Sequence, residues 1–201
     1  VFKVLLYRYS GKEEIVVGTP FANRTRQELD PLIGYFLQMF VLRSDCSGNP
    51  SFSSFLSKLN QLMSECYKNS DVPLEWVVNA LNPVRNPSFN PIFQVLFVYE
   101  NITKSPIYFG SARLHPIACE TNTAKFDLTL FIYDREDGLE CRCEYSTDLF
   151  EKETIERMLS HFKNLLLSVA ENPKENIGFL PILAEKERRL ILEKWNQTGF
   201  R

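Results

Sequence analysis

The feature that most constrains the fold is a pair of Asn-Pro steps that lead directly into an apolar segment. Asn86-Pro87 and Asn90-Pro91 precede the run Ile92–Tyr99. A proline fixes its own φ and keeps the residue before it out of helical geometry, so the segment predicts a stiff, extended loop that delivers a strand at a set angle. Side-chain amides and a guanidinium on such a loop suit the positioning of an amide-containing substrate; an ordinary strand start with capped turns is the simpler alternative. The polar residues around the loop are Arg85, Asn86, Ser88, Asn90 and Gln94.

Apolar residues elsewhere in the chain repeat at two different spacings. Those of Phe52–Cys66 and Ile155–Val169 recur at the 3.6-residue repeat of an amphipathic helix. In Leu139–Tyr145, alternating residues predict the second arm of a hairpin around Asp134–Gly138, with one buried and one solvated face. This mixture indicates an α/β fold, a mixed sheet with packed helices. The expected helices are Phe2–Tyr9, Phe52–Cys66, Asp71–Asn82, 151–171 and Lys186–Trp195; the expected strands are Glu14–Gly18, Leu37–Arg43, Ile92–Tyr99, Phe126–Tyr133 and Leu139–Tyr145.

The composition excludes several classes of protein. With 44% hydrophobic and 24% charged residues in 201, the chain is typical of a globular protein rather than a disordered one. A net charge of −2 offers no electrostatic footprint for nucleic acid. No apolar run approaches the roughly 18 residues that a membrane span needs. We therefore expect a cytoplasmic protein that binds neither nucleic acid nor membrane, and the opening Val1 is consistent with an internal fragment of a longer chain.

The cysteines do not form the pattern of a secreted disulfide framework, because their number is odd and they are not closely paired. No further Cys or His lies near them at the spacing of a zinc site, so no metal is expected. Buried free thiols are the predicted state. The five cysteines are Cys46, Cys66, Cys119, Cys141 and Cys143.

The chain also lacks an evident catalytic group. Its two histidines, His115 and His161, are far apart, and no Ser, Cys or carboxylate forms an evident triad with His115. His161 lies beside the apolar stripe of its predicted helix, which indicates a structural side chain at the edge of packing. A Gly-rich phosphate loop and an HExxH motif are both absent from the sequence.

Several segments together resemble one family, and they follow in that family's order. IGYFLQMFVLR resembles I-G-x-F-V-N-T-x-x-L-R, SDVPLEWVV resembles H-Q-D-x-P-F-E-x-L-V, and RNPSFNPIFQ resembles R-D-x-S-x-N-P-L-F-Q. YRYSGKEEIVVGTPFANR resembles the segment that leads into these motifs, and KFDLTLFIY, EYSTDLF and WNQT also match. The family is that of the condensation domains of nonribosomal peptide synthetases, and the resemblance covers essentially the whole chain.

The resemblance implies one lobe of a chloramphenicol-acetyltransferase-like fold, in which two similar lobes form a V around a channel. The family's catalytic motif, H-H-x-x-x-D-G, lies upstream of the motifs seen here and does not occur in this sequence. We therefore expect residues 1–183 to be the C-terminal lobe, inactive alone and missing its N-terminal lobe as partner. Residues 184–201 are expected to form a linker helix toward an adenylation domain, with Trp195 at that interface.

The resemblance also implies a reaction. In the family, an acceptor amine attacks a donor thioester, both carried on phosphopantetheine arms of peptidyl carrier domains, and a peptide bond forms. No cofactor is then bound directly, and this chain supplies part of the channel wall. The implied channel residues are Gly34, Gln38, Asn69, Pro73, Arg85, Asn90 and Gln94. Gln38-Met39, Asn69-Ser70 and Arg85-Asn86 depart from the family's Asn-Thr, His-Gln and Arg-Asp, which indicates an altered acceptor pocket or a weakened domain.

The sequence is also compatible with two other functional interpretations. The chain can be a non-catalytic docking module for carrier and adenylation domains, or part of another acyltransferase built on the same fold. An H-H-x-x-x-D-G motif upstream in the parent protein would favour condensation, and its absence would favour docking.

Overall fold

The computed structural model describes residues 1–24, 26–84, 86, 88–100, 107–114, 117, 122–135 and 138–197. The chain forms two compact units, each assembled from segments that are distant in sequence. The first unit contains residues 1–16, 42–71 and 151–201, and the second contains residues 17–41 and 72–150.

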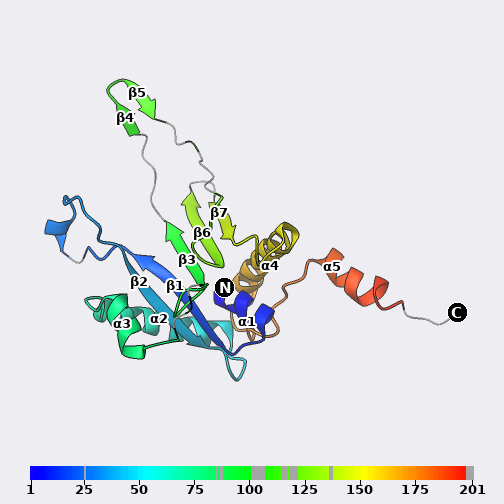
Figure 1. Ribbon diagram of the computed structural model, residues 1–201. Helices are drawn as coiled ribbons and strands as arrows, with labels where there is room; N and C mark the ends of the chain where they lie inside the picture. The colour runs from blue at the N-terminus through cyan, green and yellow to red at the C-terminus, as the bar shows by residue number, and fades with distance from the viewer. Residues whose placement is uncertain are drawn as a thin grey trace. The chain divides into compact units, whose positions relative to one another are not determined.

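The first unit is built around the helices α1 (Phe2–Ser10), α2 (Phe52–Lys68) and α4 (Lys152–Glu171). α1 packs against α4 (Figure 1), and the rings of Phe2 and Phe162 meet edge to face with 6.3 Å between their centroids. The apolar stripes of all three helices are therefore the core of this unit. Its most buried side chains are those of Val4, Leu5, Cys46, Phe55, Ile155, Leu165, Ile177 and Leu180.

Local signals in the sequence explain where these helices begin and end. α1 ends at Gly11, whose φ of 66° lies in the left-handed region that favours glycine. α2 begins after Ser51, whose hydroxyl accepts a hydrogen bond from the Ser54 N–H and so caps the helix. The segment after α4 returns to this point, because the Gly178 N–H donates to Asn49 Oδ1 at 2.7 Å.

A five-stranded mixed sheet holds most of the second unit's core. Its strands run in the order β2-β1-β3-β6-β7 (Figure 1). β3 is parallel to both β1 and β6, and β7 is antiparallel to β6. The strands are β1 (Glu14–Phe21), β2 (Gln38–Asp45), β3 (Val95–Glu100), β6 (Leu128–Arg135) and β7 (Gly138–Tyr145). A separate two-stranded sheet pairs β4 (Ile107–Phe109) with β5 (Ala112–Leu114).

The parallel pairing of β1 with β3 depends on one glycine. Gly18 pairs with Leu96, and a Cβ built on Gly18 would lie 2.2 Å from the ring of Phe93. Phe93 is only 2% exposed and stacks on Phe126 with 5.3 Å between centroids. The loop that carries the Asn-Pro steps therefore leads to a buried aromatic side chain that any residue larger than glycine at position 18 would displace.

The expected α/β class is confirmed, and so are the expected helices and strands in outline. Strand β3 begins at Val95 instead of Ile92, because residues 91–94 are irregular and bent, and the Gln94 side chain donates back to the Asn90 carbonyl. Pro73 occupies the N-cap position of the helix α3 (Leu74–Leu81) rather than lying in its first turn. The predicted terminal helix is split into α5 (Glu185–Arg189) and a π-helical segment, Leu190–Lys194.

The prediction of one buried face on the second hairpin arm was wrong. β7 is the outermost strand of the sheet, and its residues from Gly138 to Arg142 are all exposed, with Leu139 at 55%. For the same reason Cys141 is an exposed thiol, against the expectation of burial. Cys46 is buried as expected, Cys66 and Cys143 are half-buried, and Cys119 lies outside the described residues.

The first unit contains a buried lysine. Lys3 is 6% exposed, and its Nζ donates to the Leu42 carbonyl at 2.6 Å and to Ser44 Oγ at 2.7 Å. Burial lowers the pKa of Lys3 from 10.5 to about 8, because the charged form loses its hydration. Between these two values, the unfolded chain holds a proton at this residue that the folded chain has released.

We predict that Lys3→Met changes the pH dependence of stability. The unfolded state binds more protons than the folded state from about pH 8 to pH 10.5, so the wild-type free energy of unfolding gains up to about 1.4 kcal/mol per pH unit there. Urea unfolding of both proteins at pH 7.5, 9 and 10 measures the difference. Lys12→Met, at an exposed lysine, is the control; a stability difference for Lys3→Met that stays constant with pH would contradict the prediction.

Candidate functional site

The second unit contains a hollow of about 410 Å³ that brings together two segments distant in sequence. One wall comes from the residues before and at the start of β2, and the other from the first residues of α3. The lining residues are Asn23, Tyr35, Phe36, Leu37, Gln38, Met39, Pro73, Leu74 and Glu75.

Two of the predicted channel residues, Gln38 and Pro73, meet in this hollow. Gln38 is the first residue of β2 and is half-buried, so its backbone is placed by the start of the strand. Pro73 precedes α3 with φ −63° and ψ 146°, and its rigid ring turns the chain into the helix. The sequence alone could not show that these residues are neighbours.

The lining is mixed, and polar surface exceeds apolar surface. Phe36, Met39 and Leu74 provide apolar surface, while the amide of Gln38 and the carboxylate of Glu75 can bind a polar group. An arrangement of this kind suits a ligand with an amide or amine next to an apolar side chain.

The other predicted channel residues that the structure describes do not line this hollow. Gly34 lies next to Phe36, and a Cβ at Gly34 would come 3.1 Å from the Phe36 ring. The Gln94 amide donates to the Asn90 carbonyl at 2.8 Å, which stiffens the loop before β3. Asn69 ends α2 in the first unit, with its amide donating to the Glu65 carbonyl at 2.9 Å. Arg85 lies outside the described residues.

Sequence reasoning missed Asn23, Tyr35, Phe36 and Glu75 as lining residues. Each lies within a segment that resembles a family motif or leads into one. The resemblance therefore marked the right segments but did not show which of their residues line the hollow. Arg24, Arg26, Glu28 and Asp30 have the sequence pattern of a solvated charged surface, and Arg26, Glu28 and Asp30 are exposed. The Arg24 guanidinium is half-buried and binds backbone carbonyls of its own loop.

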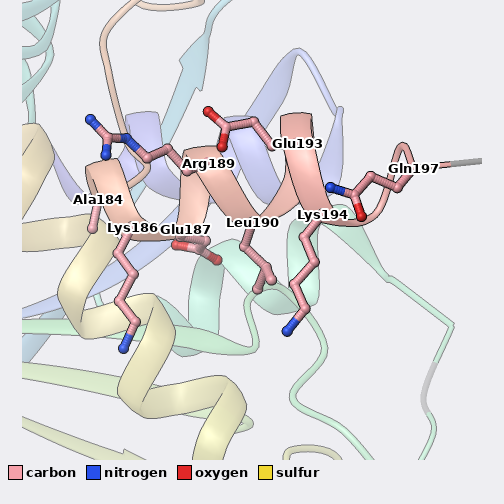
Figure 2. A pocket seen from close by; sticks show the side chains of 8 residues that line it. All are labelled: Ala184, Lys186, Glu187, Arg189, Leu190, Glu193, Lys194 and Gln197. Atoms are coloured by element: carbon pink, nitrogen blue, oxygen red, sulfur yellow. The ribbon is translucent and has the colours of Figure 1, made fainter.

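A second hollow, of about 500 Å³, lies along the terminal helical segment of the first unit. Figure 2 shows that Lys186, Leu190 and Lys194 extend to one side of this segment, while Arg189 and Glu193 extend to the other. All of the lining residues fall between Ala184 and Gln197, so the hollow belongs to a single stretch of chain. Nearby Leu192 and Trp195 are 52% and 67% exposed, which leaves apolar surface available for a partner.

His161 connects this terminal segment to the helical core of the first unit. It is 4% exposed, its Nδ1 lies 2.7 Å from the Tyr9 hydroxyl, and its Nε2 lies 2.7 Å from Glu187 Oε2. Burial raises the pKa of the Tyr9 hydroxyl. The prediction of a structural histidine agrees with this geometry, although His161 is more deeply buried than expected. His115 lies outside the described residues.

We expect Glu187→Ala to release α5 from the core. The substitution leaves a buried imidazole nitrogen without its charged partner, and a hydrogen bond to a charged group contributes about 1.5–3 kcal/mol. Amide hydrogen exchange across residues 186–194 should therefore accelerate by about 10- to 100-fold. Glu193→Ala, at an exposed carboxylate in the same segment, is the control. Equal exchange in the two variants would show that the His161 contact does not hold the helix.

Neither the thiols nor any metal ligands form a reactive centre in the described residues. Burial raises the pKa of Cys46 and of Cys143 to about 11, so both are neutral thiols near pH 7. Within the described part of the chain, no group of three or more His, Cys, Asp or Glu residues could hold a metal ion. No described helix is long and apolar enough to cross a membrane.

Comparison with known proteins identifies the family. The sequence model of the condensation domain matches residues 1–192, so this chain belongs to the condensation domain family. A linear gramicidin synthase of Brevibacillus parabrevis is 43% identical over 200 residues, and a chondramide synthase of Chondromyces crocatus is 36% identical over 199. These matches cover 98% and 99% of this chain but 3% and 5% of the two synthases, so the chain spans a small part of its relatives.

Solved structures share the fold. A four-domain nonribosomal peptide synthetase bound to AMP and glycine superposes with a TM-score of 0.83 at 22% identity, over 93% of this chain and 15% of that one. The first condensation domain of the CDA synthetase gives a TM-score of 0.71 at 16% identity, over 91% of this chain and 40% of that one. At these identities the likeness concerns the fold.

Proposed function

We propose that this chain is the C-terminal lobe of a condensation domain and forms one wall of the channel in which a peptide bond is made. The acceptor amine and the donor thioester arrive on phosphopantetheine arms of carrier domains. The amine nitrogen bonds to the thioester carbonyl carbon, the carbon–sulfur bond breaks, and the thiol of the donor arm leaves with a proton. The hollow of the second unit would hold the side chain or amide of the acceptor.

The observation that carries this proposal is the meeting of Gln38 and Pro73 in one hollow. Each comes from a different segment that resembles a family motif, and the residues between them include all of α2. Two such segments thus contribute polar groups and apolar surface to one hollow, which is the arrangement we take to bind the acceptor.

Two facts support the assignment to a single lobe. The chain spans 40% of a solved condensation domain, and its sequence contains no His-His pair. The proposed organisation is a chloramphenicol-acetyltransferase-like pair of lobes, with residues 1–183 as the C-terminal lobe and 184–201 as the linker toward an adenylation domain. The lobe would then be inactive without its partner and would act by orientation. Orienting two reactants can lower a barrier by about 7–11 kcal/mol in well-ordered cases.

We predict that Gln38→Asn changes acceptor preference more than overall rate. The shorter side chain withdraws its amide from the hollow, and a neutral hydrogen bond contributes about 0.5–1.5 kcal/mol, so the ratio of rates for two acceptors should change by about 3- to 10-fold. Single-turnover condensation with two acceptor amino acids, in the complete synthetase module that contains this chain, measures this ratio.

The matched control is Gln61→Asn, the same change on an exposed residue of α2. The 201-residue chain by itself should give no product, because it supplies no His-His pair. An unchanged acceptor ratio for Gln38→Asn, or turnover by the isolated chain, would remove the support for a channel wall.

The docking alternative is favoured by a different observation, the exposed apolar surface of the terminal segment. In the parent protein, Trp195 would then be an anchor against the adenylation domain, since exposed aromatic residues often dominate interfaces. Trp195→Ala should make proteolysis after residue 185 faster, while Phe179→Ala, at another exposed aromatic residue of the first unit, should leave it unchanged. Equal digestion of the two variants would indicate an ordinary surface tryptophan.

A further inference from the structure

One arginine, Arg24, makes hydrogen bonds to the 26–35 loop beside the hollow. Nη1 of Arg24 donates to the carbonyl of Leu29 and, at 3.3 Å, to that of Asp30, and Nη2 donates to the carbonyl of Leu32 at 2.9 Å. The same guanidinium lies over the ring of Phe36, with Cζ 4.1 Å from the ring centroid. One side chain thus donates to three carbonyls of the loop and also contacts Phe36, which lines the hollow.

Little else in the described structure anchors this loop. Apart from Leu29, which is half-buried, the described residues from Arg26 to Tyr35 are exposed; Ile33 and Tyr35 are 105% and 87% exposed. A short 3₁₀ turn, Gln27–Leu29, is its regular structure. Burial therefore contributes little to the loop's conformation. Local backbone hydrogen bonds, such as the one from the Leu32 N–H to the Leu29 carbonyl, and the polar contacts of Arg24 hold it instead.

Phe36 is the link between these contacts of Arg24 and the hollow. Its ring is bounded by the Arg24 guanidinium at 4.1 Å and by Gly34, where a Cβ would come within 3.1 Å. Phe36 lines the hollow, as does Asn23, the neighbour of Arg24 in sequence. A shift of the guanidinium would therefore remove the support of an aromatic wall of the site.

We infer that Arg24 is a positioning residue that sets the shape of the acceptor hollow by holding Phe36 and the 26–35 loop. This inference rests on the proposed function, since it takes the hollow to bind the acceptor side chain. Arg24 does not line the hollow itself, so it acts through Phe36. The consequence is a selectivity for the size of the acceptor side chain that depends on a residue outside the hollow.

An arginine suits this role and a lysine does not. The guanidinium is planar and presents five N–H donors in fixed directions, so it can donate to several carbonyls while its face stacks on an aromatic ring. A lysine ammonium is a compact charge on a flexible stem and cannot reproduce both contacts at once. Arg24→Lys therefore keeps the positive charge but loses the simultaneous hydrogen bonds to the carbonyls and the stacking on Phe36.

The test compares Arg24→Lys with Arg26→Lys in the complete synthetase module. Arg26 is exposed and lies in the same loop, so it reports the effect of losing a guanidinium there without the contacts of Arg24. The substrates are soluble aminoacyl-pantetheine thioesters with a small and a bulky side chain as acceptors. We expect Arg24→Lys to raise the acceptor KM about 10-fold, to change kcat by less than about twofold, and to alter the ratio of kcat/KM between the two acceptors.

A second variant keeps the inference testable if Arg24→Lys folds poorly. Phe36→Leu retains Arg24 and removes the ring, and it should change the acceptor ratio in the same direction. In the double variant, Arg24→Lys should add little to the change made by Phe36→Leu, because both act through the same wall. Independent effects that simply add would overturn the inference, as would a loss of kcat and of folded protein at an unchanged KM and acceptor ratio.

Gln38→Asn, measured alongside, separates the role of Arg24 from the role of the hollow. If Gln38→Asn changes the acceptor ratio and Arg24→Lys behaves like Arg26→Lys, the hollow binds the acceptor and the role of Arg24 is wrong. If neither Gln38→Asn nor Arg24→Lys changes the acceptor KM or ratio, the hollow is not the acceptor site, and the proposed function fails with it.

Discussion

The contact between Gly18 and Phe93 is the constraint on which the second unit depends. β1 and β3 can pair in parallel only if the ring of Phe93 lies over a position without a side chain. Phe93 in turn stacks on Phe126, just before β6, so one buried ring aligns the starts of two neighbouring strands. The Asn-Pro loop, which leads directly into Phe93, therefore determines where this ring lies.

The candidate site is stabilised by polar contacts rather than by buried aromatic packing. The hollow is bordered by a loop with little buried surface, and directional polar contacts replace packing there. Arg24 donates to carbonyls of Leu29, Asp30 and Leu32, while Gly34 leaves room for the ring of Phe36. Such a loop can vary in its exposed residues without changing the wall that it presents.

Repeating patterns in the sequence predicted the helices and most strands, because apolar residues at regular spacing report burial directly. They failed at β7, whose alternating residues have the pattern of a half-buried strand although Leu139 and Cys141 are exposed at the sheet edge. Resemblance to family motifs located Gln38 and Pro73, but not their proximity. It could not identify Arg24 as the fastening of the loop, since donation to backbone carbonyls leaves no mark in the sequence.

The π-helical turn at Leu190–Lys194 makes the orientation of Trp195 sensitive to the deletion of a residue. In this wider turn the Trp195 N–H donates to the Leu190 carbonyl, one residue further back than in an α-helix. Every side chain after it is consequently rotated relative to those of α5. The direction in which Trp195 faces is thus set by the number of residues in the turn as well as by their identity, so loss of a single residue there would redirect the tryptophan while leaving the sequence around it intact.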